Sequence, residues 1–203
     1  MLDALKIPKA DIMGYSLGSY IAQAFTTNYP KKVNNLILVA ATCGGEDGIP
    51  APPEFMKMQN EVVNKSVNNI PTTADEMKQL VVASLGSGWI KLHPESLDIP
   101  ENMKPGLTPE TMNNQGNVAF DWVAKNCSGA CDELAKIAKP PLVITGTDDN
   151  YLVPHGNALI LAGKIPGAWL VQIKDAGHAI MDHYPAEVAE ILNTFLSTSG
   201  QSS

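Results

Sequence analysis

Four short runs of apolar residues, separated by segments with helical periodicity, restrict the fold more than any other feature of the chain. Three of the four runs are almost continuously apolar, which is typical of strands covered on both faces in a parallel sheet. Strands are predicted at 10–13, 35–40, 141–146 and 168–173, and core helices at 17–29, 155–164 and 185–196. This alternation predicts an α/β fold with a parallel sheet of about four strands joined by right-handed crossovers.

A long segment between the second and third predicted strands interrupts this alternation. It begins as a loop rich in glycine and proline, and then shows helical periodicity over 54–69, 74–85 and 109–126. Little of it has the pattern of a strand. The sequence therefore predicts a core made of residues 1–43 and 127–203, with a helical cap inserted at 44–126.

The charge of the chain argues against one class of function. The 203 residues carry a formal net charge of −7, and all 14 basic residues are lysines. Without arginine the chain lacks the bidentate group that best grips phosphate and guanine, and no basic cluster replaces it. No apolar run approaches the roughly 18 residues that a membrane span requires. We therefore expect neither a nucleic-acid partner nor a membrane.

The three cysteines, Cys43, Cys127 and Cys131, do not follow the spacing of a disulfide framework. Cys127 and Cys131 would meet on one helical face, but no further metal ligands stand nearby. An odd number of cysteines without framework spacing predicts reduced, half-buried thiols. The N-terminus shows neither the basic nor the apolar region of a signal peptide. We therefore expect no metal site and a cytoplasmic location.

The first predicted strand runs directly into a G-x-S-x-G pentapeptide, Gly14-Tyr15-Ser16-Leu17-Gly18. At a sharp turn from strand to helix, this pattern lifts the serine hydroxyl above the sheet. Side chains two positions before and two after the serine would clash in such a turn, which would explain both glycines. The helix N-terminus then offers the N–H of Leu17 to a substrate oxygen that gains charge. A chance pentapeptide is the alternative, and the placement between strand and helix argues against it.

Two other strand ends carry the groups that a nucleophilic serine needs. Asp148 and Asp149 follow the third predicted strand, and His178 follows the fourth. Because the carboxyl ends of parallel strands share one edge of the sheet, we expect these side chains to converge on Ser16. Histidine activates serine by taking its proton, and a carboxylate fixes the histidine tautomer. The remaining histidines, which we interpret as surface or rim residues, are His93, His155 and His183.

The chain order of serine, aspartate and histidine resembles that of the α/β-hydrolases. The resemblance rests on residues 14–18, on LVITGTDDNYLVP (142–154) and on DAGHAIMDHYPAEVAEILNTFL (175–196). These segments look like the branch that contains haloperoxidase-like esterases and related small-molecule hydrolases. In that family the acid closes a G-x-x-D tetrad, which implies Asp149, and the histidine follows a glycine, which implies His178. The resemblance covers 1–43 and 127–196, and the cap matches only in position and size.

The resemblance implies a carboxylesterase-like serine hydrolase that cleaves a small ester or acyl compound through an acyl-enzyme. Ser16 would attack, His178 would carry the proton, Asp149 would orient the imidazole, and Leu17 would donate to the oxyanion. No metal or organic cofactor is implied. The candidate substrate-binding residues are Tyr15, Trp89 and Trp122, with Phe55, Met56 and Met58 as further candidates for the cap pocket. For each of these cap side chains, ordinary core packing is the alternative. A lyase that uses the same three residues is a further alternative, and it would need an additional acid or base in the cap.

The resemblance also implies elements that these 203 residues do not contain. Members of the family carry about four strands ahead of the nucleophile, with an HG-type loop that supplies a second oxyanion donor. Gly44 and Gly45, which follow the second strand, are a poor substitute for that loop. The strand at 10–13 would keep an unpaired outer edge, which invites another chain. We therefore expect a homo-oligomer or a fragment of a longer product, and the alternative function is a truncated, weakly active or inactive scaffold that binds a small ligand or a partner chain.

Overall fold

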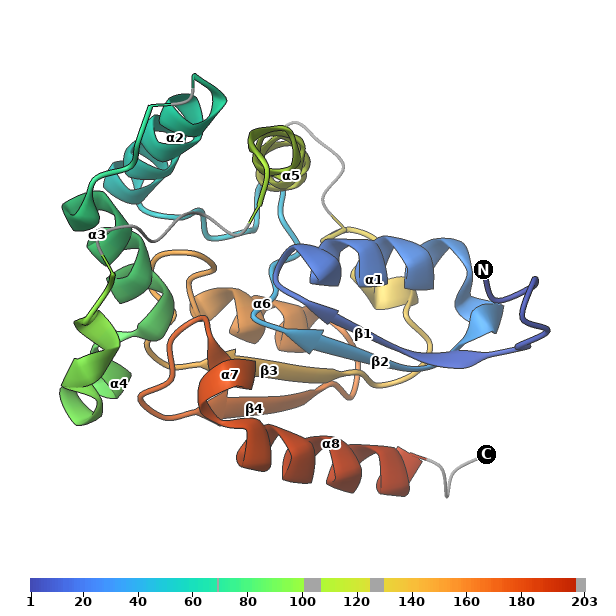
Figure 1. Cartoon of the computed structure of the whole chain (residues 1–203). Coiled ribbons are helices and arrows are strands. Elements are labelled where there is room, and N and C mark those ends of the chain that lie inside the picture. The colour runs from blue at the N-terminus through green and yellow to red at the C-terminus, as the bar shows by residue number, and fades with distance from the viewer. Residues whose placement is uncertain (69, 101–106, 125–129, 200–203) are drawn as a thin grey trace.

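A parallel sheet of four strands forms the centre of the chain (Figure 1). The computed structural model describes residues 1–68, 70–100, 107–124 and 130–199. The strands are β1 (Ala10–Tyr15), β2 (Val33–Val39), β3 (Leu142–Gly146) and β4 (Trp169–Ile173), and they lie in the order β1-β2-β3-β4. Each neighbouring pair is parallel. The predicted α/β fold with about four parallel strands is therefore confirmed, and β1 and β4 form the two edges.

Helices cover both faces of this sheet. In Figure 1, α1 (Leu17–Asn28) and α6 (Gly156–Lys164) lie on one face, and α8 (Pro185–Ser199) follows the short α7 (Ile180–His183) across the other. Alternate residues of β2 point to opposite faces. Leu36 and Leu38 join the core beneath α1, whereas Ile37 and Val39 join the core against α8. The second half of β2 is thus buried on both faces, which explains the continuous apolar run from Leu36 to Val39.

The described part of the insertion between β2 and β3 is helical. It contains α2 (Pro53–Val67), α3 (Ala74–Leu85), α4 (Ser87–Leu92) and α5 (Pro109–Val123). Short 3-10 turns occur at η1 (Pro30–Lys32) before β2, at η2 (Pro94–Leu97) after α4, and at η3 (Leu134–Lys136) before β3. α3 begins in a capping box, in which Thr73 and Glu76 each accept the other's backbone N–H. In Figure 1, α2, α3 and α4 stand beyond the carboxyl ends of the strands, and α5 lies above α1.

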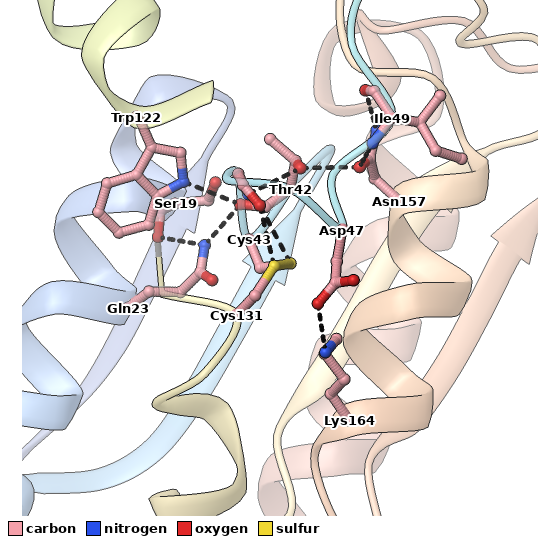
Figure 2. The surroundings of a disulfide bond; sticks show 11 residues. Ser19, Gln23, Thr42, Cys43, Asp47, Ile49, Trp122, Cys131, Asn157 and Lys164 are labelled. Carbon is pink, nitrogen blue, oxygen red and sulfur yellow. Dashed lines mark hydrogen bonds and ion pairs between the residues drawn. A yellow bond between two sulfur atoms is a disulfide. The ribbon is translucent and has the colours of Figure 1, made fainter. Parts of the chain in front are cut away.

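A disulfide joins Cys43, just after β2, to Cys131, just before η3 (Figure 2). Backbone pairing accompanies the bond, since the Ala130 N–H donates to the Cys43 carbonyl at 2.8 Å. The prediction of reduced thiols is therefore wrong for these two cysteines. They are 88 residues apart in the sequence, and only the fold of the insertion brings them together. Cys127 lies outside the described residues.

The disulfide also removes one of the two reasons for expecting a cytoplasmic location. That reason was reduced thiols, and disulfides are rare in the reducing cytosol. A separate finding concerns membranes: of the helices that the structure describes, none combines the length and the apolar character that a span requires.

Candidate active site

Ser16 is the single residue between β1 and α1. Its backbone has φ 51° and ψ −122°, a conformation that residues with side chains rarely adopt. The Ser16 N–H donates to the Val39 carbonyl at 2.9 Å, and the Ser19 N–H donates to the Ser16 carbonyl at 2.8 Å. These two bonds hold the strained residue from both sides. The turn places Ser16 at the N-terminus of α1, where the N–H of Leu17 has no partner inside the helix.

Only one of the two glycines of the pentapeptide is required by a close contact. A Cβ at Gly14 would stand 2.4 Å from the Gly18 carbonyl oxygen and 2.6 Å from the Ser19 Cα, so only glycine fits there. A Cβ at Gly18 would meet nothing within 4 Å. The expectation that both glycines avoid a clash is therefore right for Gly14 and wrong for Gly18. α1 approaches β1 closely at Gly14, so a side chain is excluded there and not at Gly18.

The structure brings Ser16, Asp149 and His178 together at the carboxyl edge of the sheet. His178 Nδ1 lies 2.7 Å from Asp149 Oδ2, and His178 Nε2 lies 2.8 Å from Ser16 Oγ. Asp149 and His178 are buried, and Asp149 Oδ1 accepts from the Val153 N–H at 3.1 Å. Because an ionised carboxylate can only accept, the imidazole donates from Nδ1 and accepts the serine proton at Nε2. Such a chain of hydrogen bonds is able to draw the proton from a serine hydroxyl.

The neighbouring Asp148 makes a different set of contacts. Its Oδ2 accepts from Ser87 Oγ at 2.9 Å and from the Gly88 N–H at 2.7 Å, both in the first turn of α4. A carboxylate in this place satisfies a helix N–H that has no partner inside the helix. Asp148 therefore ties α4 to the loop after β3, and of the two aspartates only Asp149 reaches His178.

The end of α3 holds the loop that carries His178. The Gly177 N–H donates to the Leu85 carbonyl at 3.1 Å, and the Ala179 N–H donates to the Ser84 carbonyl at 3.0 Å. The carbonyls of a last helical turn lack partners inside the helix. Those of α3 accept hydrogen bonds from the backbone N–H groups on either side of the histidine. A Cβ at Gly177 would stand 2.3 Å from the Leu85 carbonyl carbon, so glycine is required for this approach.

Tyr15 supports the same loop from β1. Its hydroxyl donates to the His178 carbonyl at 2.8 Å, and its ring centroid lies 5.4 Å from the imidazole. Burial, followed by the negative charges of Asp182 and Asp149, raises the pKa of Tyr15 to about 12. The phenol therefore remains a hydrogen-bond donor at neutral pH. The structure gives Tyr15 a contact that positions His178 in place of the predicted contact with substrate.

A cavity of about 490 Å³ opens beside Ser16, between α1 and the insertion. Its walls are mostly apolar, and they include Leu17, Ile49, Met56, Leu80, Phe120 and Val153. Besides Ser16, the neutral polar residues of the described lining are Tyr20, Thr42, Gln59, Asn60 and Gln115. Within the described chain, no charged side chain lines the cavity. A space of this kind suits an uncharged, largely apolar group.

The side chains predicted for the cap pocket are divided between two hollows. Met56 lies in the lining of the cavity beside Ser16. Phe55 and Met58 line a second hollow of about 550 Å³ between α2 and α3, where Phe55 packs against Tyr151 with ring centroids 5.9 Å apart. Neither of these two residues borders the cavity that Ser16 shares.

Trp89 lies outside the lining of the cavity. Its ring is stacked between those of His93 and His183, with centroids 4.0 Å away on each side. Burial lowers the pKa of His183, which favours the neutral imidazole in this stack. Trp89 therefore fastens α4 to α7, and the prediction that it binds substrate does not agree with its position.

Trp122 also lies outside the lining, directly behind it. Its indole stacks on Tyr20 with centroids 5.1 Å apart and an interplanar angle of 6°. Its Nε1 donates to the Thr42 carbonyl at 3.2 Å (Figure 2). Trp122 thus fastens α5 to α1 and to the loop after β2. The residue against which it packs, Tyr20, is the one of the two that lines the cavity.

Tyr20 and Thr42 are polar cavity residues that the sequence did not single out. Tyr20 stands three residues after Leu17, so helical periodicity places both on one face of α1 and was a usable signal. Thr42 lies in the loop after β2, whose course depends on the disulfide and on the insertion. No local pattern marks such a residue.

Two curated proteins illustrate the relatives of this chain. The chain is 28% identical over 206 residues to the poly(3-hydroxyalkanoate) depolymerase of Ectopseudomonas oleovorans, with 99% of this chain and 65% of that protein covered. It is 25% identical over 196 residues to the monoacylglycerol lipase abhd6-B of Xenopus laevis, with 92% and 54% covered. The chain therefore spans 65% or less of the length of these two relatives.

Solved structures and a family model agree on the fold. The thermophilic esterase of Thermogutta terrifontis superposes with a TM-score of 0.74 at 22% identity, covering 98% of this chain and 68% of that one. The family model for the alpha/beta hydrolase fold matches residues 1–183. This match takes in the sheet, the insertion and the three loops that meet at the serine. The chain belongs to the α/β-hydrolase fold family.

Proposed function

We propose that the chain is a serine-dependent hydrolase that cleaves a small ester through an acyl-enzyme. Ser16 Oγ attacks the carbonyl carbon, and His178 Nε2 takes the serine proton as the new bond forms. Asp149 fixes the imidazole tautomer and stabilises the imidazolium. The Leu17 N–H donates to the carbonyl oxygen as it becomes an oxyanion. What carries this proposal is the hydrogen-bond chain from Asp149 through His178 to Ser16, with links of 2.7 Å and 2.8 Å.

The rest of the cycle uses the same groups. The imidazolium of His178 gives its proton to the leaving alkoxide, and the alcohol departs. A water molecule then attacks the acyl group on Ser16, with His178 again taking a proton. The free serine and the carboxylic acid are the products of this second step.

The cavity supports an uncharged acyl group as the substrate, with segment 44–126 serving as the cap that walls it. The described lining contains no lysine, so a carboxylate placed against it would lose its hydration without gaining a partner there. The likeness to a poly(3-hydroxyalkanoate) depolymerase and a monoacylglycerol lipase is consistent with an ester substrate.

Covalent labelling tests this proposal. We expect an alkyl fluorophosphonate to modify Ser16, because its phosphorus accepts the activated hydroxyl as an ester carbonyl would. Mass spectrometry of the digested protein should find the adduct on the Ser16 peptide and not on the peptide that contains the exposed Ser87. Pre-incubation with an ester substrate should slow the labelling. An adduct spread over several serines, or none at all, would contradict the proposal.

A second candidate function, a scaffold that binds another chain, is favoured by the outer edge of β1. In the described chain β1 pairs only with β2. Met13 on β1 is 38% exposed, and Ile21 on α1, the helix that contacts β1, is 64% exposed. Unpaired strand edges beside apolar side chains recruit further strands. We propose that a second copy of the chain covers this edge.

Light scattering coupled to size-exclusion chromatography should therefore report more than one chain per particle. Met13→Lys should shift the particles towards the monomer, because a charge beside the edge opposes strand pairing. Leu159→Lys is the matched control, since Leu159 is also exposed but lies on α6 between β3 and β4. A wild-type monomer at all concentrations would exclude self-association.

A further inference from the structure

The hydroxyl groups at the floor of the cavity differ in whether they are free to meet a substrate. Ser16, Tyr20 and Thr42 are the hydroxyl-bearing residues among its described lining. The Ser16 hydroxyl is engaged with His178. Thr42 Oγ1 donates to Asn157 Oδ1 at 2.7 Å and accepts from the Gly44 N–H at 3.1 Å, so both of its functions are used (Figure 2).

Tyr20 differs from these two hydroxyls. It is only 6% exposed, and its oxygen makes no hydrogen bond to any part of the chain that the structure describes. Among the described residues, the side-chain oxygens that are fully enclosed without a partner are Ser19 Oγ and Gln23 Oε1, and the Tyr20 oxygen is not one of them. Its hydroxyl therefore keeps access to the cavity. A buried donor without a partner is costly unless a bound molecule supplies the acceptor.

The position of Tyr20 on α1 places it one turn from the reacting atoms. Tyr20 follows Leu17 by three residues, so these two lie on one face of the first turn of α1, and both line the cavity that Ser16 shares. Long side chains in helices lean back towards the N-terminus, which here is the turn that carries Ser16. Burial and the negative charge of Asp149 raise the pKa of Tyr20 to about 12, so the phenol keeps its proton at neutral pH.

Packing fixes the ring of Tyr20 before any ligand arrives. The ring is stacked on Trp122, and Trp122 is in turn held by its indole bond to the Thr42 carbonyl. The Gly45 N–H also donates to the Trp122 carbonyl at 3.2 Å. A donor held in this way reaches its acceptor without reorganisation, which is what makes such groups effective in stabilising developing charge.

We propose that the Tyr20 hydroxyl is a second oxyanion donor, which acts with the Leu17 N–H on the substrate carbonyl oxygen. The inference rests on the proposed function. When Ser16 Oγ bonds to the carbonyl carbon, the electron pair of the C=O double bond moves to the oxygen and the serine proton passes to His178. Tyr20 keeps its own proton throughout and only shares it in a hydrogen bond.

The variant Tyr20→Phe tests the inference, because it removes the hydroxyl and retains the ring that stacks on Trp122. We expect kcat for p-nitrophenyl butyrate to fall about 100-fold, as for the loss of one oxyanion donor. KM should change by less than about threefold, since the bond strengthens mainly in the transition state. The thermal midpoint should not fall, because no hydrogen bond of the free protein is lost. Tyr29→Phe is the matched control, with an exposed ring that should leave kcat unchanged.

A second measurement separates this role from packing. A short-chain alkyl trifluoromethyl ketone adds to the serine and places an oxyanion where the ester would. Its inhibition constant should rise for Tyr20→Phe by about the same factor as kcat falls, while the product carboxylic acid should inhibit both proteins equally. If hydrolysis depends on Ser16 and Tyr20→Phe keeps the wild-type kcat, this inference is wrong and the proposed function stands. If the wild type shows no hydrolysis beyond that of Ser16→Ala, both are wrong.

Discussion

Replacing Asp149 by asparagine should lower kcat for p-nitrophenyl butyrate about ten-thousandfold, with little change in the fold. The asparagine Oδ1 can still accept from the Val153 N–H, which leaves its amide group facing His178 Nδ1. The imidazole must then accept at Nδ1 and carry its proton on Nε2, where it can no longer take the proton of Ser16. Stopped-flow and steady-state assays, read against the Ser16→Ala background, measure this loss.

Asp148→Asn is the control for that experiment. The substitution lies one residue away and removes the same charge, but Asp148 contacts Ser87 and Gly88 of α4 and does not touch the histidine. An asparagine oxygen can still accept from the Gly88 N–H, so we expect kcat within about threefold of the wild type. Equal losses in the two variants would show that the acid was assigned to the wrong residue.

Removing the disulfide should have the largest effect on stability. Cys43→Ala combined with Cys131→Ala should lower the free energy of unfolding by about 4 kcal/mol in the chain-entropy description, because the bond closes a loop of 88 residues. The loop contains the whole insertion. Without the disulfide, the unfolded chain therefore gains the conformational entropy of this entire segment. Urea titration followed by tryptophan fluorescence measures the change.

Reduction gives the control for this second experiment. Dithiothreitol should destabilise the wild type by the same amount as the double substitution, and it should leave the double variant unchanged. A variant that is still destabilised by dithiothreitol would place the stabilising bond elsewhere in the chain. A wild type that resists both reduction and substitution would contradict the bond between Cys43 and Cys131.

The strands and the residues at their ends were readable from the sequence for physical reasons. β2 and β3 are enclosed on both faces, so the runs Leu36–Val39 and Leu142–Ile144 are apolar at successive positions and stand out from the rest. A parallel sheet gathers its strand ends at one edge, so Ser16, Asp149 and His178 could be grouped although they are far apart in the chain. The choice between Asp148 and Asp149 required the resemblance to a family, because both follow the same strand.

The contacts of individual aromatic side chains were not readable. Tyr15, Trp89 and Trp122 are amphipathic rings near the serine in sequence or in the insertion, and each ends in a contact between two elements: β1 with the histidine loop, α4 with α7, and α5 with α1. Such contacts depend on how the insertion packs on the core. The pairing of Cys43 with Cys131 depends on the same packing, and for this reason periodicity and spacing did not reveal it.

The bonds between the end of α3 and the histidine loop restrict how molecules can enter and leave. Because Ser84 and Leu85 hold the peptides on both sides of His178, a swing of α3 away from the sheet would displace the imidazole and disable the chemistry. Substrate and product therefore have to pass a part of the cavity wall that can move without displacing His178. α5 does not meet that requirement, because its Trp122 stacks on Tyr20 and donates to the Thr42 carbonyl. α2 meets it: in the described chain α2 makes no backbone hydrogen bond to the histidine loop, and its Met56 borders the cavity. We therefore expect a substrate to enter on the α2 side, with α3 and α5 acting as fixed walls.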